Sequence, residues 1–211
     1  MSFPHSEAAT LLEKACQQLP FEVSASQQLQ LLAFLALIHK WNKAYNLTSV
    51  RDPLAMVAVH LVDSIAVCPF LKGQNVIDVG TGPGLPGVPL AILCPDTHFV
   101  LLDSLGKRIR FLKQVAFDLK LANIEPVQSR VEEYSSPGFD TVVTRAYASI
   151  EQMLHSCQHL LNKNGEFLAL KGQYPADELD IISNEYIISG IEPIKVPGLA
   201  AQRHVIKIKK Q

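Results

Sequence analysis

The residues best suited to chemistry form a glycine-rich turn after a short strand. The strand is predicted over Asn75–Val79, because this stretch is rich in β-branched residues. Four glycines follow it closely: Gly80, Gly82, Gly84 and Gly87. They allow positive φ angles and a close approach of the backbone to a ligand. A strand, a glycine turn and a helix N-terminus in this order typically cradle a nucleotide-like ligand.

Two classes of ligand fit this turn. Gly82, Gly84 and Gly87 match the G-x-G-x-x-G fingerprint of dinucleotide sites, and Asp103 follows at the distance of a residue that binds ribose hydroxyls. Asp78 at the strand end instead favours S-adenosylmethionine (SAM), whose ammonium and sulfonium groups are cations, whereas a pyrophosphate would avoid a carboxylate. We therefore favour SAM and keep an NAD-dependent oxidoreductase as the alternative.

Length and composition indicate one domain, or a domain with an appended lobe. The 211 residues are 48% hydrophobic and 18% charged, which is ample for a core. The net charge of -1 means that a nucleic-acid site would have to be a local basic patch. The four cysteines lack C-x-x-C spacing, and neither a signal peptide nor a long apolar span is evident. We expect a cytoplasmic protein with reduced cysteines and no membrane partner.

Residues 1–70 are predicted to form a helical lobe. Its three helices have candidate caps: Ser6 for one that stops near Pro20, Ser24 with Gln27 for one that runs to about Trp41, and Asp52-Pro53 for the third. On the third helix, His60 and Asp63 lie away from the apolar face. We interpret them as a polar pair on the surface of the lobe.

Residues 71–211 alternate between strands and helices. Strands are expected over 75–79, 98–103, 124–128, 139–144, 165–170, 186–194 and 204–208. Helices are expected near 87–94, over 106–119, and from a cap at Ser149 to a stop at Asn164-Gly165. This alternation predicts an α/β fold with a doubly wound, mostly parallel sheet. Five residues lie at or just after strand ends, where such sheets bind ligands: Asp78, Gly80, Asp103, Glu132 and Arg145.

Eight segments of the chain together carry a resemblance to a known family: Trp41–Thr48, Arg51–Pro53, His60–Ser64, Asp78–Gly87, Leu102–Ser104, Arg130–Glu133, Thr144–Ala146 and Leu170–Gly172. With these segments, the chain from about residue 30 onward resembles the RsmG (GidB) family of bacterial 16S rRNA guanine-N7 methyltransferases. The glycine segment is shared with many enzymes, whereas the first and third segments are far more specific. Thr144 and Ile65 depart mildly from the expected serine and leucine. The resemblance implies a Rossmann-like class I SAM-dependent methyltransferase.

The resemblance also implies cofactor contacts. They fall at Gly80, Leu85, Val131, Glu132 and Arg145, to which the glycine motif adds Gly82 and general fold mechanics adds Asp103 on the ribose. The ligand of Arg145 is left open among the cofactor, the target base and a phosphate. The alternative for Glu132 and Arg145 is a structural ion pair with no ligand. SAM is the only cofactor expected. His155 and His159 have a metal-like spacing without the glutamate of a zinc protease, so no metal is expected.

The implied partner is 16S rRNA, the 30S subunit or its assembly intermediate, bound by a monomer. Candidate RNA contacts are Lys107, Arg108, Arg110 and Arg203, and each of these has a solvated surface role as its alternative. N7 of guanine carries an in-plane lone pair and no proton at neutral pH, so its attack on the methyl group needs no general base. The sequence offers no obvious base, which agrees with this chemistry. A small-molecule SAM methyltransferase is the second alternative.

Overall fold

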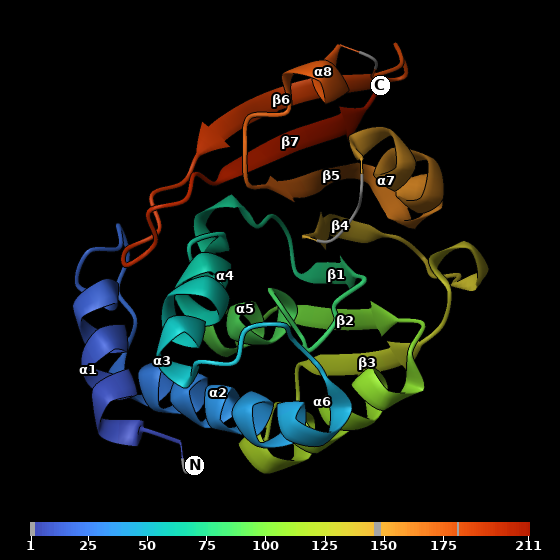
Figure 1. The fold of residues 1–211 in the computed structure, drawn as a ribbon. Coiled ribbons are helices and arrows are strands. Elements are labelled where there is room, and N and C mark those ends of the chain that lie inside the picture. Colours follow the sequence, from blue (N-terminus) through green and yellow to red (C-terminus); the bar gives the residue numbers. More distant parts are fainter. Residues whose placement is uncertain (1–2, 146–148, 181) are drawn as a thin grey trace.

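The computed structural model describes residues 3–145, 149–180 and 182–211 (Figure 1). Seven strands form one sheet in the order β3-β2-β1-β4-β5-β7-β6. Their bounds are β1 (Asn75–Val79), β2 (His98–Asp103), β3 (Ile124–Gln128), β4 (Phe139–Thr144), β5 (Leu161–Lys171), β6 (Tyr186–Pro193) and β7 (His204–Lys210). The first five strands pair in parallel, and β7 runs antiparallel between β5 and β6. The strand order reverses between β1 and β4, which is where such sheets bind ligands.

The helices of the described residues flank this sheet. They are α1 (His5–Cys16), α2 (Ala25–Tyr45), α3 (Pro53–Met56), α4 (Asp63–Ile65), α5 (Gly87–Leu93), α6 (Gly106–Leu119), α7 (Ile150–Cys157) and α8 (Ala176–Leu179). A π-helical segment, Val57–Val62, joins α3 to α4, so the helical run from residue 53 to 65 is continuous. Figure 1 shows α1 to α4 gathered on one side of the molecule, beside α5 and α6.

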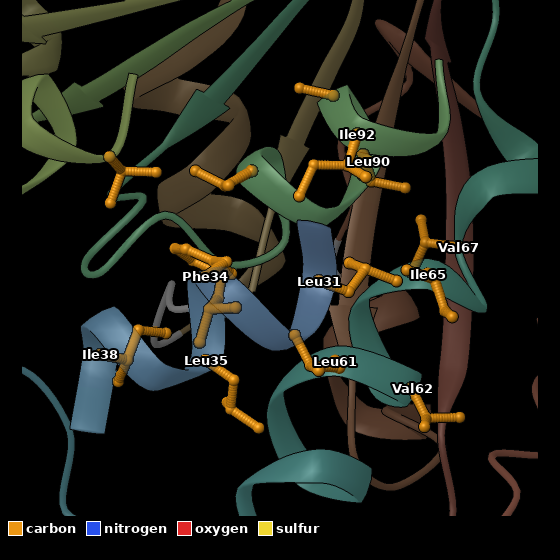
Figure 2. Close-up of a cluster of buried hydrophobic side chains, with 14 of the residues drawn as sticks. Leu31, Phe34, Leu35, Ile38, Leu61, Val62, Ile65, Val67, Leu90 and Ile92 are labelled. Atoms are coloured by element: carbon orange, nitrogen blue, oxygen red, sulfur yellow. The ribbon is translucent and has the colours of Figure 1, made fainter. Parts of the chain in front are cut away.

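The N-terminal helices share a hydrophobic core with one face of the sheet. Figure 2 shows this core where side chains of α2, of the 53–67 segment and of α5 meet: Leu31, Phe34, Leu35, Ile38, Leu61, Val62, Ile65, Val67, Leu90 and Ile92. Successive strand residues point to opposite faces, so Val76 belongs to this core while Ile77 faces a second one beneath α7. The lobe predicted at 1–70 is therefore a helical layer built onto the sheet.

The Pro53–Phe70 segment is apolar and long enough, at 18 residues with a mean hydropathy of 1.7, to cross a membrane by length and composition. More than half of it is buried inside the protein. His60, Asp63 and Ser64 within it are also buried and hydrogen-bonded to the fold. We therefore describe it as a core helix.

Three of the four predicted helix caps are confirmed. Ser24 and Gln27 form a full capping box, while the side chains of Asp52 and Ser149 accept hydrogen bonds from the first turns of their helices. The prediction for Ser6 is wrong, because α1 already begins at His5 after Pro4 and has no side-chain cap.

The expected helix stop at Asn164-Gly165 is also wrong. Helix α7 ends at Cys157, and β5 begins at Leu161. Pairing of β5 with β4 continues to Phe139 opposite Leu161, with a bulge before Thr141 pairs with Glu166. Strand pairing has overridden the local turn signal here.

The four cysteines, all within the described residues, form no disulfide bond. Although Cys68 and Cys94 are far apart in the sequence, the fold brings their Sγ atoms to 3.5 Å from each other.

Candidate functional site

The four glycines after β1 fall into two groups. Gly80 and Gly82 have φ angles of +71° and +60°, and a Cβ atom on either would meet nothing closer than 4.0 Å. Gly84 and Gly87 are packing residues, because a Cβ atom would lie 2.5 Å and 2.3 Å from the nearest side-chain atoms. Gly80 therefore faces open space and, among the described residues, an added Cβ atom at Gly82 would touch only the Gly80 carbonyl, while the last two glycines let α5 pack closely on the sheet.

A cavity of about 280 Å³ opens beside Gly80, at the carboxyl ends of β1 and β2. It is lined by Val79, Gly80, Leu102, Asp103, Ser104, Arg108, Ser129, Arg130, Val131 and Glu132. Four of the seven predicted cofactor residues thus meet in one cavity: Gly80, Asp103, Val131 and Glu132. We call this space the cofactor cavity. Its open wall at Gly80 fits a ligand that lies against the backbone.

Asp103 shapes this cavity through its carboxylate. The Oδ2 atom accepts hydrogen bonds from the Gly82 N–H at 3.0 Å and from Nη1 of Arg108 at 2.9 Å. The Oδ1 atom accepts from the Leu105 N–H at 2.9 Å. Since an ionised carboxylate has about four lone-pair sites, a ribose hydroxyl can still be accommodated. Asp103 therefore holds the second glycine in place and leaves room for the predicted ribose contact.

Asp78 does not line the cofactor cavity, which corrects the argument that it faces the cations of SAM. It is 1% exposed, and its Oδ2 atom accepts from the Thr81 hydroxyl at 2.6 Å and from the Gly87 N–H at 2.8 Å. Burial raises the pKa of Asp78 to about 6, although both hydrogen bonds and the charge of Arg145 oppose the rise. Asp78 thus ties β1 to the first turn of α5 from behind the glycine turn.

Leu85 and Arg145 lie outside the cofactor cavity. Leu85 is buried in the core beneath the turn, at 3% exposure. Arg145 lines a second pocket of about 300 Å³, which we call the arginine pocket. Its walls are Val59, Asp63, Val67, Arg145, Leu170, Lys171, Gly172, Ile194, Arg203 and His204. Ala146, the last residue of the Thr144–Ala146 segment, lies outside the described residues.

Asp63 is the main residue that the sequence prediction misplaced. Its side chain is 6% exposed and lies between Nη1 of Arg145 at 3.2 Å and Nε of Arg203 at 2.7 Å. His60 turns to a different partner, with its Nε2 atom 3.0 Å from the Thr48 hydroxyl. Burial, together with the charge of Arg145, lowers the pKa of His60 to about 4. The two residues are therefore not a surface pair. The sequence signal that could have indicated their burial was the presence of His60, Asp63 and Ser64 within an otherwise apolar helix.

The four predicted RNA contacts also lie in different parts of the structure. Arg108 faces the cofactor cavity rather than the outer face of α6, because it pairs with Asp103. The Lys107 ammonium donates to the Tyr45 carbonyl at 2.9 Å, and Arg203 lies in the arginine pocket. Only Arg110 of this set is fully exposed. Among the described residues, no group of three or more His, Cys, Asp or Glu side chains could hold a metal ion.

The sheet order and the glycine-lined cavity define a Rossmann-like class I methyltransferase fold. Solved structures with this fold include TrmN from Thermus thermophilus (TM-score 0.56, 15% identity, 81% of this chain and 53% of that chain). TYW2 from M. jannaschii in complex with AdoMet is also similar (TM-score 0.55, 16% identity, 72% of this chain and 76% of that chain). At these identities the likeness concerns the fold alone.

The sequence comparison is more specific. Residues 27–206 match the family described as rRNA small subunit methyltransferase G, or GidB. Relatives with the name Ribosomal RNA small subunit methyltransferase G, from Escherichia coli O1:K1 / APEC and Shigella boydii serotype 18, are each 56% identical over 184 residues. The alignments cover 87% of this chain and 89% of each relative. The chain belongs to this family and is a methyltransferase.

Proposed function

We propose that this protein transfers the methyl group of SAM to N7 of a guanine in the 16S rRNA of the small ribosomal subunit. The observation that carries the proposal is the open cavity beside Gly80 in a chain that belongs to this methyltransferase family. The choice of rRNA follows the names of relatives that are 56% identical. The choice of guanine N7 follows the family resemblance of the sequence segments.

The residues of the cofactor cavity fit SAM. Gly80 offers backbone without a side chain to the methionine part, and Asp103 offers a carboxylate to the ribose. Val131 and the exposed Glu132 offer an apolar surface and an acceptor to the adenine. When bound, SAM supplies a methyl group on a positively charged sulfur. Contact of Leu85 with the cofactor remains a prediction, and Arg145, which lies outside the cofactor cavity, is open between cofactor, target base and phosphate.

The protein needs little acid–base chemistry for this reaction. The N7 lone pair is free at neutral pH, so no side chain has to remove a proton from it. The buried carboxylates of the two pockets, Asp63 and Asp103, are paired with arginines, and neither is needed as a base. Rate enhancement then comes from alignment of the reacting atoms and from exclusion of water. The methylated base is cationic, so carboxylates near it stabilise the charge as it develops.

The partner and location follow from this substrate. The protein would act as a monomer in the cytoplasm, on naked 16S rRNA, the 30S subunit or an assembly intermediate. The glycine cavity alone does not select RNA, but the names of the 56% identical relatives disfavour a small-molecule methyltransferase. Membership of the methyltransferase family disfavours an NAD-dependent oxidoreductase.

The test is transfer of label from SAM to 30S subunits and to 16S rRNA from cells that lack this activity. We expect label in 7-methylguanosine at one rRNA position, identified by nucleoside analysis. SAM binding without transfer to either RNA substrate would favour a small-molecule substrate. NAD binding without SAM binding would return the oxidoreductase to consideration.

A further inference from the structure

The arginine pocket lies beside the cofactor cavity, across the reversal of strand order. The Thr144 hydroxyl donates to the carbonyl of Val79 at 3.0 Å, which joins the carboxyl ends of β4 and β1. Val79 lines the cofactor cavity, and Arg145 lines the arginine pocket. A molecule that reacts with a ligand in the first space can therefore extend into the second.

The arginine pocket carries an excess of positive charge. Arg145, Arg203 and Lys171 line it, and among the described residues of its walls Asp63 is the only acidic one. Lys171 also pairs with Glu178, 2.8 Å away, so three cations face two carboxylates. About a quarter of each arginine side chain is exposed, at 27% for Arg145 and 24% for Arg203.

Both arginines keep hydrogen-bonding capacity. Arg145 uses Nη1 for Asp63 and the Val59 carbonyl, while Arg203 uses Nε for Asp63 and Nη1 for the Gln202 carbonyl. Within the part of the chain that the structure describes, Nη2 of each arginine makes no hydrogen bond. The buried Asp63 carboxylate holds both guanidinium groups in place, so their Nη2 donors have a fixed orientation. A pair of oriented guanidinium donors suits a phosphate group.

Guanine itself is a poor ligand for this fork in this enzyme. The usual arginine contact to guanine uses O6 and N7. Under the proposed function N7 is the nucleophile, and an N–H group bound to it would occupy the lone pair that reacts.

An exposed aromatic residue, Tyr174, packs edge-on against His204 at the pocket, with ring centroids 5.9 Å apart and 53% exposure of Tyr174. Such a side chain can stack on a nucleotide base.

We propose that the arginine pocket binds a backbone phosphate of the RNA next to the target guanine. Arg145 and Arg203 are the phosphate ligands, and Asp63 is the positioning residue that holds both guanidinium groups. This inference rests on the proposed function and deepens it, because it places the RNA strand on the β4 side of the cofactor cavity.

Arg203→Gln tests the phosphate contact without touching the cofactor cavity. We expect the KM for 30S subunits to rise about tenfold, since one charge-assisted hydrogen-bonded contact is lost. The slope of log affinity against log salt, from direct binding to 30S subunits, should become shallower by about 0.7–0.9. SAM affinity by calorimetry should stay unchanged. Lys163→Gln, which removes an exposed charge at the start of β5, is the matched control and should change neither quantity.

Unchanged KM and salt slope in Arg203→Gln, with an active wild type, would overturn the phosphate pocket alone. Absence of both methyl transfer and 30S binding in the wild type would overturn the proposed function, and the pocket assignment with it.

Asp63→Asn tests the positioning role. The substitution makes the protein more positive. If Asp63 only offset positive charge, its removal would therefore tighten RNA binding. We expect the opposite: a higher KM for 30S subunits with unchanged SAM affinity, because the arginines lose their fixed orientation. Asp63→Glu should recover part of the loss. Tighter binding, or a lower melting temperature with an unchanged KM, would overturn the positioning role.

Discussion

At the scale of single residues, the glycine turn separates ligand-facing positions from packing positions. Gly80 opens onto the cofactor cavity, whereas Gly84 and Gly87 meet neighbouring side chains within 3 Å of an added Cβ atom. The two aspartates near the turn differ in the same way. Asp103 lines the cavity, and Asp78 supports the turn from the buried side.

Gly80→Ala should lower SAM affinity at least tenfold, because its methyl group would project into the cofactor cavity. The positive φ angle also strains any side chain, at a cost of about 1–2 kcal/mol. Gly198→Ala is the matched control, since its φ of +81° imposes the same strain far from the cavity. Calorimetry of both variants separates the two effects. Equal SAM affinity in Gly80→Ala and wild type would contradict the cavity assignment.

Asp78→Asn should reveal the buried carboxyl in the pH dependence of stability. The folded-state pKa of Asp78 is about 6, against an ordinary value of 3.8. Its contribution to stability is therefore complete below pH 3.8 and is lost as the pH rises through 6. The loss is about 3 kcal/mol. The difference in unfolding free energy between wild type and variant should fall by most of this amount from pH 4 to 7. A difference that does not vary with pH would refute the assignment.

At the scale of elements, α2 is the helix that connects the lobe to the methyltransferase fold. Its capping box begins at Ser24, and the Gln27 side chain also donates to the carbonyls of Ile92 and Leu93 at the end of α5. Farther along, Phe34 and Trp41 pack against Phe111 of α6. This helix therefore supports both helices that follow the turns of the cofactor cavity.

Ser24→Ala should lower the unfolding free energy by about 1 kcal/mol, because the Gln27 N–H loses its acceptor. Ser6→Ala is a suitable control, since α1 has no side-chain cap, and its effect should stay within about 0.5 kcal/mol. Denaturant titration measures both. A loss in Ser6→Ala as large as that in Ser24→Ala would show that the cap is not the cause.

At the scale of the whole molecule, the lobe and the sheet share one core. Leu31 and Phe34 of α2 are fully buried in the same cluster as Val76 of β1 and Phe99 of β2. The ion pairs of Asp63 with Arg145 and Arg203 also join the lobe to β4 and β7. These contacts predict that the lobe and the sheet lose their structure together.

Leu31→Ala should destabilise both parts by about 2–5 kcal/mol. Fluorescence of Trp41, the single tryptophan, reports on the lobe, and far-UV circular dichroism reports on the whole chain. We expect the two denaturation curves to coincide in wild type and to shift together in the variant. Separate midpoints would show that residues 1–70 are an independent domain.

Local patterns were enough to predict most elements and much of the candidate site. β1, α6, β3 and β4 begin and end where strand and helix patterns place them, because these segments combine strong periodicity with clear flanking turns. The glycine turn identified the cofactor cavity for the same reason, since backbone freedom is a local property. Of the residues that line it, Gly80 belongs to this turn, whereas Val131 and Glu132 were predicted from the family resemblance and Asp103 from its place at the end of a strand.

The tertiary structure decided how distant segments meet. The insertion of β7 between β5 and β6, the bulge that starts β5 early, and the burial of Asp78 depend on pairing and packing that no local pattern contains. The arginine pocket is the clearest example. Asp63, Arg145 and Arg203 lie far apart in the sequence. Only the strand order brings both guanidinium groups to within 3.2 Å of the Asp63 carboxylate.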